Sequence, residues 1–499
     1  MKSKLKNLSK YIFTDIKFLS KVPFTLFITI FLVPIVLINI NYQIGLLFIA
    51  FYVAYWSIKA FQNYYFILKS FFELLGINKK DYKHFLSLLS EAKDLQHVVL
   101  IPVYSEPYDV IEDSVKSVLE NDYPFKENIT VLLAVEERWD EAPDNARKVI
   151  KKLSGKTPVK IEMVLHPADL PGESKVKGAN ITYATCEYEK NNNLDPHLTL
   201  VHSIDTDTNL EKNFFLISSY IFLSTDYRDN AIYQYMPVYS NNWHKGTFFS
   251  RLIAVGTTFR QLGESQNPEF YRNFAVYGQS LYCLKKSNYW SLDSIVEDGL
   301  QYWRSYFAFD SKFRIVNVPA VCKMDLVEEE NFFKSVKSQY KQLRRWSWGC
   351  SDVEYVIPEF YKNNKIKLIE KIRKTVYLLI NHMFWASASF LFLLIGYFPG
   401  FSFRITDSIS TFTVPISISI ISSFLFLTII LPSFLSTLIM RKYTKFRKRD
   451  YVINMAQWIL IPFLKMTLFS IPAIESQFRL FMGKRLDNFE TTKKLSRKK

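Results

Sequence analysis

Two aspartates one residue apart, Asp205 and Asp207, are the strongest candidates for chemistry in this 499-residue chain. They follow an apolar run, Leu198 to Ile204, that predicts a buried strand. Open α/β sheets bind their ligands at the carboxyl ends of such strands. Two neighbouring carboxylates can approach one divalent cation, and Mg²⁺ or Mn²⁺ prefers oxygen ligands. The alternative is that either aspartate caps a helix that we expect to begin near Leu210.

A second group of polar side chains follows the first predicted strand, in the sequence IPVYSEP. Tyr104 has an aromatic face that can stack on a nucleobase, and Glu106 can accept hydrogen bonds from a ribose hydroxyl or a base edge. A plain surface turn is the alternative for both residues.

Strands and helices alternate along the segment that must position these side chains. Strands are predicted at 97–104, 128–136, 160–165 and 198–204, and helices at 107–121, 140–153 and 175–190. This alternation predicts an α/β fold with a mainly parallel sheet and right-handed crossovers. The pattern after Asp207 is less regular, with helices expected at 210–223, 248–263 and 331–349 and strands at 232–239 and 313–321.

Apolar segments at both ends of the chain predict membrane helices. The uncharged run between Lys21 and Lys59 is long enough for two spans with a turn at 39–43, and 61–75 is expected to lie at the membrane surface. Further spans are expected at 375–397 and within 408–440. A fifth apolar segment, 451–468, is interrupted by Pro462, Lys465 and the nearby Pro472, so we interpret it as re-entrant or interfacial.

The net charge of +16 is explained by basic clusters beside these segments, since no nucleic-acid-binding motif is present. The positive-inside rule places the Lys-rich N-terminus, the central domain and the basic loop 441–449 in the cytoplasm of a plasma (inner) membrane protein. Four widely spaced cysteines predict free thiols in a reducing compartment. The predicted organisation is 1–75 (basic segment, two spans and interfacial helix), 94–330 (catalytic domain), 331–364 (interfacial helix) and 365–499 (C-terminal membrane region and basic tail).

Four motifs occur in order along the central segment: IPVYSEP, DTD, VED and QLRRW. In this order and spacing, between membrane helices, they resemble the membrane-embedded family 2 glycosyltransferases with a GT-A fold, the group of cellulose and hyaluronan synthases. The resemblance covers about Gln96 to Gly349. The Q-x-x-R-W sequence, which follows an E-D pair and precedes membrane spans, is its most specific element.

The resemblance assigns roles to further residues. Asp298, which follows Glu297, is expected to be the general base that deprotonates the acceptor hydroxyl; an acidic first turn of a helix is the alternative. Glu136, with Glu137, occupies the place of an aspartate pair that contacts the nucleotide in the family, and the longer side chains are a departure from it.

In the sequence GESKVKGAN, the resemblance implies that a lysine meets the diphosphate and that Asn180 contacts the sugar nucleotide. Lys177 is the better candidate, because Lys175 is equally compatible with a solvated helix start.

On the last motif, spacing of three and four places Gln342 beside both Arg345 and Trp346. We expect Arg345 to bind the diphosphate, Gln342 and Trp346 to bind the acceptor, and Arg344 to face lipid headgroups; simple anchoring at the bilayer is the alternative. Gly278 is expected to permit close approach of an acceptor, with a plain turn as the alternative.

The sequence therefore predicts an inverting membrane glycosyltransferase. It would use a nucleotide-diphosphate sugar, which we expect to be a UDP-sugar, and Mg²⁺ or Mn²⁺, and it would extend a polysaccharide and move it across the bilayer. Two alternatives remain open: addition of a single sugar to a lipid carrier, and a catalytically inactive receptor or transporter subunit on the same fold.

Overall fold

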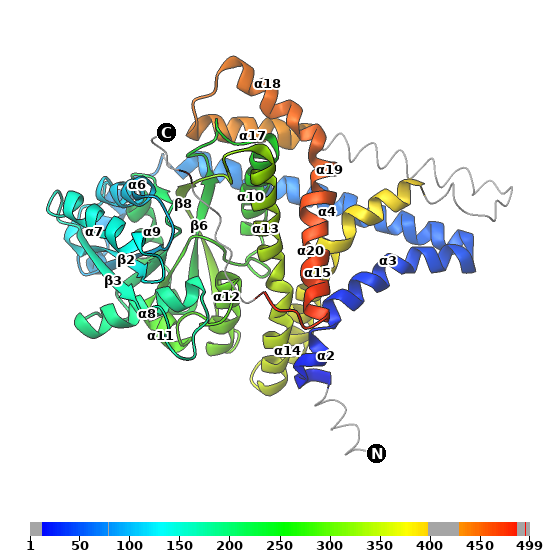
Figure 1. Ribbon diagram of the computed structural model, residues 1–499, viewed down its shortest axis with the longest axis horizontal. Helices are drawn as coiled ribbons and strands as arrows, with labels where there is room; N and C mark the ends of the chain where they lie inside the picture. The colour runs from blue at the N-terminus through cyan, green and yellow to red at the C-terminus, as the bar shows by residue number, and fades with distance from the viewer. Residues whose placement is uncertain (1–11, 78, 398–428, 487–494, 496–499) are drawn as a thin grey trace. The chain divides into compact units, whose positions relative to one another are not determined.

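The computed structural model describes residues 12–77, 79–397, 429–486 and 495. It divides into two compact units (Figure 1). The helical unit comprises Met1–Ile67 and Tyr340–Arg485, and the α/β unit comprises Leu68–Gln339 and Leu486–Lys499.

A mixed sheet forms the centre of the α/β unit (Figure 1). Its strands are β1 (Gln96–Val103), β2 (Ile129–Glu136), β3 (Lys160–His166), β4 (Thr199–Ser203), β5 (Asn209–Leu210), β6 (Ala231–Tyr239), β7 (Tyr277–Ser280) and β8 (Arg314–Met324). They lie in the order β3-β2-β1-β4-β7-β6-β8-β5. The first four in this order are parallel, β7 runs antiparallel to both of its neighbours, and β6 and β8 are parallel to each other. The predicted α/β fold with a mainly parallel sheet is confirmed.

This topology brings several strand ends to one edge of the sheet, which we call the carboxyl edge. Because β7 is antiparallel to β4, its first residue, Tyr277, pairs with the last residue of β4, Ser203. Strands β6 and β8 run in the same direction as β4, so Tyr239 and Met324 also end at this edge. Polar residues just beyond these positions therefore share one surface of the unit.

Helices cover both faces of the sheet. They are α6 (Tyr108–Leu119), α7 (Glu141–Leu153), α8 (Lys177–Asn191), α9 (Phe214–Leu223), α10 (Phe248–Ser265), α11 (Leu281–Lys286) and α12 (Glu297–Ala308). On one face, Ile181 of α8 and Leu284 of α11 pack on Val98, Leu132 and Val201 from three adjacent strands. Alternate residues of a strand point to the same face of the sheet, so these three side chains form one continuous apolar surface. Because helices cover the other face as well, the residues between them are also apolar.

Two elements of the α/β unit differ from the sequence-based expectation. The helix expected to begin near Leu210 begins at Phe214, because Asn209 and Leu210 pair with β8 instead. Strand β7 was not predicted, since its four residues, YGQS, carry neither an apolar run nor an alternating pattern.

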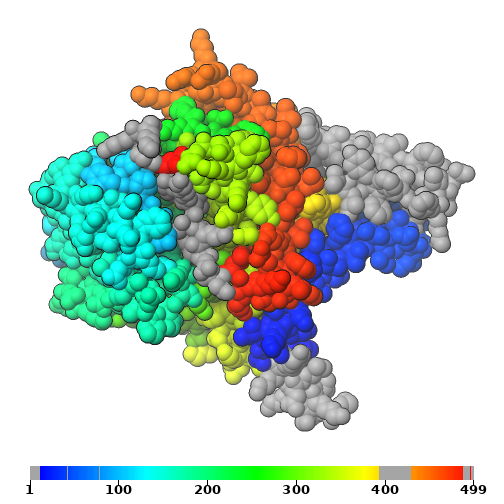
Figure 2. Space-filling view, in the orientation of Figure 1, coloured from blue at the N-terminus to red at the C-terminus, as the bar shows by residue number. Residues whose placement is uncertain are grey.

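The helical unit contains helices long and apolar enough to cross a membrane. Among the described residues they are Ile16–Ile40, Gln43–Ile77, Leu368–Phe392 and Lys448–Phe481. They include α3 (Val22–Ile40), α4 (Tyr42–Ile77) and much of α15 (Leu368–Tyr397). Large apolar side chains lie on their surfaces, as at Phe51 in α4 and at Val452 in α18 (Lys448–Ala456), which is orange in Figure 2. Such exposure is expected of surfaces that face lipid.

One prediction about these helices is wrong. Residues 61–75 do not form a separate interfacial helix, because α4 continues without a break to Ile77. The interruptions expected within the last apolar segment are present as changes of helix type, to a 3-10 helix at Gln457–Leu460 and to a π-helix at Lys465–Ser470. Pro462 and Pro472 lie in the first turns of α19 (Ile461–Leu464) and α20 (Ile471–Phe481), which follow these two pieces. The re-entrant or interfacial placement of the segment stays a prediction.

The resulting segment, Lys448–Phe481, is long enough to span a membrane. The turn expected at 39–43 is confirmed by the break at Asn41 between α3 and α4. Of the fourth expected span, residues up to 428 lie outside the described residues, and α17 (Ile430–Tyr443) follows them.

Candidate active site

Two of the motifs, DTD and VED, meet Lys177 of the GESKVKGAN sequence at the carboxyl edge of the α/β unit. The Lys177 ammonium lies 2.7 Å from Oδ1 of Asp205, beyond the end of β4, and 3.6 Å from Oε1 of Glu297 at the start of α12. Asp298 follows Glu297 in the first turn of the same helix. The structure thus places the predicted metal ligand, the predicted diphosphate ligand and the predicted base on neighbouring elements of one surface.

The start of α8 is held where it is by a glycine. A Cβ atom on Gly178 would lie 2.2 Å from the carbonyl oxygen of Ser291 and 3.2 Å from Cβ of Glu297. Only a residue without a side chain allows this approach. The close contact fixes the neighbouring Lys177 beside Glu297, and sequence reasoning had not singled out this glycine.

Lys177 is a buried cation among carboxylates. Burial alone lowers the pKa of Lys177, but the negative charges of Asp205, Glu297 and Asp298 outweigh burial and hold this pKa above its ordinary value. The ammonium is therefore a permanent positive charge at this edge. A fixed cation in a partly buried position is suited to binding the negative charge of a diphosphate.

Neither aspartate of the D-T-D sequence caps a helix, so the capping alternative is wrong. Helix α9 has Asn213 at its N-cap position. Asp207 is buried, and its Oδ2 accepts a hydrogen bond of 3.0 Å from the main-chain N–H of Asp325, which follows β8. The Thr206 hydroxyl donates to the carbonyl of Pro102 on β1. These bonds fix the D-T-D turn between the ends of β1 and β8.

The two aspartates fit a divalent cation whose remaining coordination positions are filled by the phosphates of a bound substrate. The Asp205 side chain is 35% exposed and offers carboxylate oxygens at the surface, whereas one Asp207 oxygen is engaged with Asp325. No group of three His, Cys, Asp or Glu side chains among the described residues is placed to enclose a metal ion. Mg²⁺ is commonly bound by one or two carboxylates together with substrate phosphates, and this arrangement corresponds to such a partial site.

Asp298 is held by main-chain donors. Its Oδ1 accepts a hydrogen bond of 2.7 Å from the N–H of Gly299, and its Oδ2 accepts one of 2.9 Å from the N–H of Ala275. Ala275 adopts a left-handed conformation with φ of 55°, which is unfavourable for alanine. Asn273 donates to the main-chain carbonyl of Asp298 over 2.7 Å. A strained residue that points its N–H at a carboxylate is typical of a functional site, although the same position is compatible with an acidic first turn.

Two tyrosines that the sequence did not single out lie near the same carboxylates. Burial raises the pKa of Tyr239, at the end of β6, and the charges of Asp205, Asp207 and Asp298 raise it further. Burial also raises the pKa of Tyr277, and the charges of Glu297 and Asp298 add to that effect. Both hydroxyls therefore stay protonated and can donate hydrogen bonds. For Tyr239, the last residue of the predicted strand 232–239, the position at a strand end would have been the signal.

Aromatic side chains gather at the ends of β1 and β2. The Tyr104 ring lies 5.3 Å from the ring of Trp139, which is 40% exposed, and 5.5 Å from the guanidinium carbon of Arg138. Oε2 of Glu106 accepts a hydrogen bond of 2.7 Å from the N–H of Tyr104, so this carboxylate closes the turn after β1. Trp139 and Arg138 were not predicted, although they directly follow the Glu-Glu pair that ends β2.

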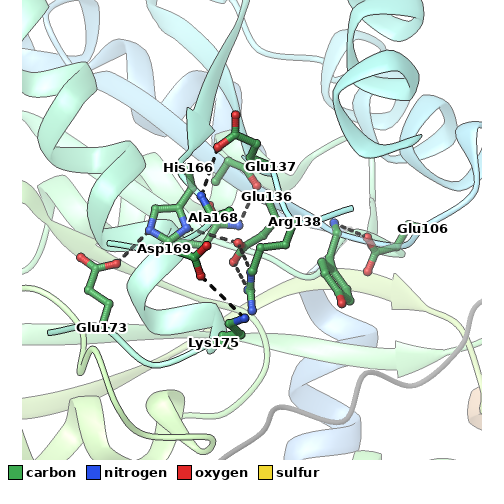
Figure 3. Close-up of polar contacts among 12 residues, drawn as sticks. Glu106, Glu136, Glu137, Arg138, His166, Ala168, Asp169, Glu173 and Lys175 are labelled. Atoms are coloured by element: carbon green, nitrogen blue, oxygen red, sulfur yellow. Dashed lines mark hydrogen bonds and ion pairs between the residues drawn. The ribbon is translucent and has the colours of Figure 1, made fainter. Parts of the chain in front are cut away.

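The carboxylate of Glu136, predicted to contact the nucleotide, is engaged by side chains of the protein, and its contact with a nucleotide stays a prediction. Its oxygens accept hydrogen bonds from Arg138 Nε (2.8 Å) and Nη2 (2.6 Å), and Oε2 also lies 3.2 Å from Nδ1 of His166 (Figure 3). The side chain is buried. Burial raises the pKa of Glu136, but the bonds to His166 and Arg138 reverse this effect and lower it, so the carboxylate stays charged and paired.

Asn180 is buried, and its predicted contact with the sugar nucleotide stays a prediction. It is 2% exposed, and its Nδ2 donates to the carbonyl of Ala134 over 2.8 Å, so it joins α8 to β2. Lys175, the less favoured lysine, lies at the surface 3.9 Å from Asp169. The site therefore takes one lysine, Lys177, from this segment.

Gly278 has a packing role. A Cβ atom there would lie 2.2 Å from the hydroxyl of Tyr235, so the space beside the glycine is filled by a buried tyrosine. Its predicted contact with an acceptor stays a prediction.

Gln342, Arg345 and Trp346 belong to the helical unit, on α13 (Phe332–Ser347). Their predicted contacts with diphosphate and acceptor stay predictions. Arg344 does not face lipid headgroups: its Nη1 lies 2.8 Å from Oε1 of Glu475 on α20. The same carboxylate accepts a hydrogen bond of 2.6 Å from the Tyr340 hydroxyl.

Comparison with known proteins adds structural neighbours only. No protein family's sequence profile matches the chain, and no curated protein matches it. Among solved structures, a mannosyltransferase from Pyrobaculum calidifontis in complex with GDP-Man and Mn²⁺ aligns over 83% of this chain and 98% of its own, with 12% identity and a TM-score of 0.45.

Two further solved structures align less completely. GalNAc-T7 with UDP, GalNAc and Mn²⁺ covers 59% of this chain and 61% of its own (11% identity, TM-score 0.35). TarS from S. aureus covers 77% of this chain and 55% of its own (13% identity, TM-score 0.33). All three TM-scores are below 0.5, so the function proposed below rests on the side chains at the carboxyl edge.

Proposed function

We propose that this chain is a membrane-bound glycosyltransferase that transfers a sugar from a nucleotide-diphosphate sugar to an acceptor hydroxyl, with inversion at the anomeric carbon. One observation carries the proposal. Carboxylates from two separate motifs, at Asp205 and Glu297, meet a single buried ammonium, that of Lys177, at the carboxyl edge of an α/β sheet. Catalysis of this kind needs a general base that accepts the proton of the acceptor hydroxyl, and a fixed positive charge for the departing diphosphate. It also needs a surface on which the nucleobase can bind.

Each of these requirements has a candidate side chain. Lys177 binds the diphosphate through its permanent charge, and the phenol of Tyr239 is a protonated donor for phosphate or sugar oxygens. Asp298 accepts the proton of the acceptor hydroxyl, in an orientation fixed by the N–H groups of Gly299 and Ala275.

Asp205 and Asp207 would hold a divalent cation, Mg²⁺ or Mn²⁺, together with the diphosphate. When bound, such a cation supplies additional positive charge to the leaving group. The departure of the nucleoside diphosphate from the anomeric carbon thus depends on Lys177 and the two aspartates, whereas attack by the acceptor hydroxyl on that carbon depends on Asp298.

The finer proposal is a polysaccharide synthase that uses a UDP-sugar and extrudes its product. The Q-x-x-R-W helix beside the candidate spans supports it, because an indole can stack on a growing chain. Transfer of one sugar to a lipid carrier is distinguished by product length. An inactive receptor or transporter subunit is distinguished by the absence of any turnover.

The test is release of nucleoside diphosphate from a panel of sugar nucleotides by the purified full-length protein with Mg²⁺ or Mn²⁺. Asp298→Asn keeps the size and hydrogen bonds of the side chain but removes the proton acceptor, so turnover should fall by a factor on the order of 10²–10⁴ while donor binding persists. Asp144→Asn, a change to an exposed aspartate paired with Arg147 on α7, is the matched control and should leave turnover unchanged. Near-normal turnover by Asp298→Asn contradicts its role as base, and absence of turnover with every donor contradicts the proposed function.

A further inference from the structure

The ends of β2 and β3 and the segments that follow them carry four titratable side chains that the proposed transfer does not use: Glu136, Arg138, His166 and Glu173 (Figure 3). We call them the Glu136 cluster. The parallel pairing of β2 with β3 places Glu136 directly opposite His166. His166 Nδ1 lies 3.2 Å from Glu136, and its Nε2 lies 2.9 Å from Glu173. The imidazole therefore bridges two carboxylates.

The two carboxylates favour the protonated form of the His166 imidazole. Burial lowers the pKa of His166, but the hydrogen bonds to Glu136 and Glu173 reverse that effect and the net result is a raised pKa. A protonated imidazole donates to both carboxylates at once. The imidazole shares Oε2 of Glu136 with Arg138 Nε, so both groups orient the same carboxylate.

Arg138 is fixed by that carboxylate. Two of its nitrogens, Nε and Nη2, are engaged with Glu136, and its side chain is 15% exposed. Its guanidinium carbon lies 5.5 Å from the centre of the Tyr104 ring. Nη1 has no hydrogen-bond partner among the described residues, so its two N–H groups remain to bind a ligand beside Tyr104 and Trp139.

We propose that Arg138, held by the Glu136 cluster, selects the nucleobase of the sugar nucleotide. It favours a nucleobase that presents a carbonyl oxygen to the guanidinium over one that presents an amino group at the same position. The proposal rests on the proposed function, because it assumes that a nucleotide stacks on Tyr104. Uracil and hypoxanthine present the carbonyl, and cytosine and adenine present the amino group at the equivalent position.

The selection follows from hydrogen-bonding capacity. A guanidinium has only donors and is charged at every relevant pH, so it pairs with a carbonyl oxygen and cannot pair with an amino group. A free carboxylate at the end of β2 would accept from an amino group, but both oxygens of Glu136 are already bonded to Arg138. The longer side chain of a glutamate at this position thus serves to hold a donor.

The experiment measures binding of four nucleoside diphosphates to the full-length protein in detergent with Mg²⁺. UDP with CDP, and IDP with ADP, form two pairs that differ mainly in the carbonyl or amino group. We expect the wild type to prefer UDP over CDP and IDP over ADP by a factor on the order of ten to one hundred, since an unpaired donor is costly. Arg138→Gln should abolish both preferences, and Arg147→Gln, at an exposed arginine on α7, should keep them.

The ratio of affinities separates selection from structural damage, because damage to the pocket weakens both members of a pair. If Arg138→Gln binds no nucleotide, Arg138→Lys decides, since it retains the charge but loses the paired geometry and should reduce the preference. A wild type that does not discriminate, or variants at Arg138 that keep the full preference, overturns the assignment. Arg138-dependent discrimination without sugar transfer supports the assignment and contradicts the proposed function alone.

Discussion

A chain of hydrogen bonds inside the α/β unit leads to a quantitative prediction about acid stability. His97 on β1 and His202 on β4 are fully buried, with Nδ1 of His97 2.9 Å from Nε2 of His202. The chain continues from His202 Nδ1 to the Tyr235 hydroxyl (2.6 Å) and from His97 Nε2 to the Ser219 hydroxyl (3.0 Å). Burial lowers the pKa of His97 to about 3, and burial together with the neighbouring His97 lowers the pKa of His202 well below its ordinary value.

The sign of the effect follows from where each state takes up protons. In the unfolded chain both histidines bind a proton near pH 6.5, whereas in the folded protein they stay neutral to much lower pH. Their neutral burial therefore costs nothing above pH 6.5 and destabilises the fold as the pH falls below it, until the folded state itself is protonated near pH 3 for His97. Each histidine contributes a loss of about 1.4 kcal/mol per pH unit in this window. Between pH 8 and pH 5 the two together lower the free energy of unfolding by about 4 kcal/mol.

Hydrogen exchange of the β1 and β4 amides, measured on the full-length protein in detergent, reports the opening free energy of this unit at each pH. Between pH 8 and pH 5, the free energy of unfolding of the variant His97→Gln should fall by about 2 kcal/mol less than that of the wild type, whatever the stability of the variant at pH 8. His166 has a raised pKa and so stabilises the fold at low pH, but this contribution is common to both proteins and cancels in the comparison.

The control is His197→Asn, at a half-exposed histidine paired with Asp229, which should keep the wild-type dependence. If the free energy of unfolding of His97→Gln falls between pH 8 and pH 5 by as much as that of the wild type, burial does not hold His97 neutral and the reasoning fails.

Three other outcomes are expected. Asp207→Asn should abolish turnover while hydrogen exchange of β4 stays as in the wild type; unchanged turnover, or full activity in EDTA, would contradict a metal role. Gly178→Ala drives a Cβ atom into the Ser291 carbonyl, so it should cost about 1–3 kcal/mol in the free energy of unfolding and raise the KM for the donor, and a normal KM would show that the start of α8 does not position Lys177. Trp346→Ala should shorten the product or divert turnover to donor hydrolysis more than it weakens donor binding, and product of normal length made at the normal rate would reduce the helix to an anchor.

The strands that build the carboxyl edge could be predicted because their signal is local. β1, β2 and β4 are uninterrupted apolar runs, and a parallel strand buried on both faces needs such a run. Once those strands are recognised, the polar residues that follow them must lie at one edge. For this reason the order of elements placed Asp205 at the carboxyl edge, whereas the contact of Lys177 with Asp205 is known only from the structure.

Strand β7 shows where this kind of reasoning stops. Its four residues form a strand because β4 and β6 flank them on both sides, and that pairing involves residues more than forty positions apart in the sequence. Tyr277 reaches the carboxyl edge only through the reversed direction of β7. A residue whose place depends on a non-local pairing carries no local signal, and the tyrosine was therefore not predicted.

Arg344 and Glu136 illustrate the same limit for side chains. Each was interpreted from its own position, as a group facing lipid or a nucleotide, and each is engaged by a partner of opposite charge. For Arg344 the partner, Glu475, is 131 residues away on α20. For Glu136 the partner, Arg138, is only two residues away, but whether the two side chains meet depends on the turn after β2 and on His166 from β3.

Gly278 connects the active-site surface with the buried histidines. The glycine leaves room for the Tyr235 hydroxyl, and that hydroxyl lies 2.6 Å from Nδ1 of His202, three residues before Asp205. The hydrogen-bonded chain therefore fixes β4 from within the core at the point where the strand delivers its aspartates to the carboxyl edge. A side chain at position 278 would displace Tyr235, leave His202 without this partner and disturb the end of β4. Loss of activity in a Gly278 variant would consequently be accompanied by weaker protection of the β4 amides, whereas a glycine that only admitted an acceptor would leave that protection unchanged.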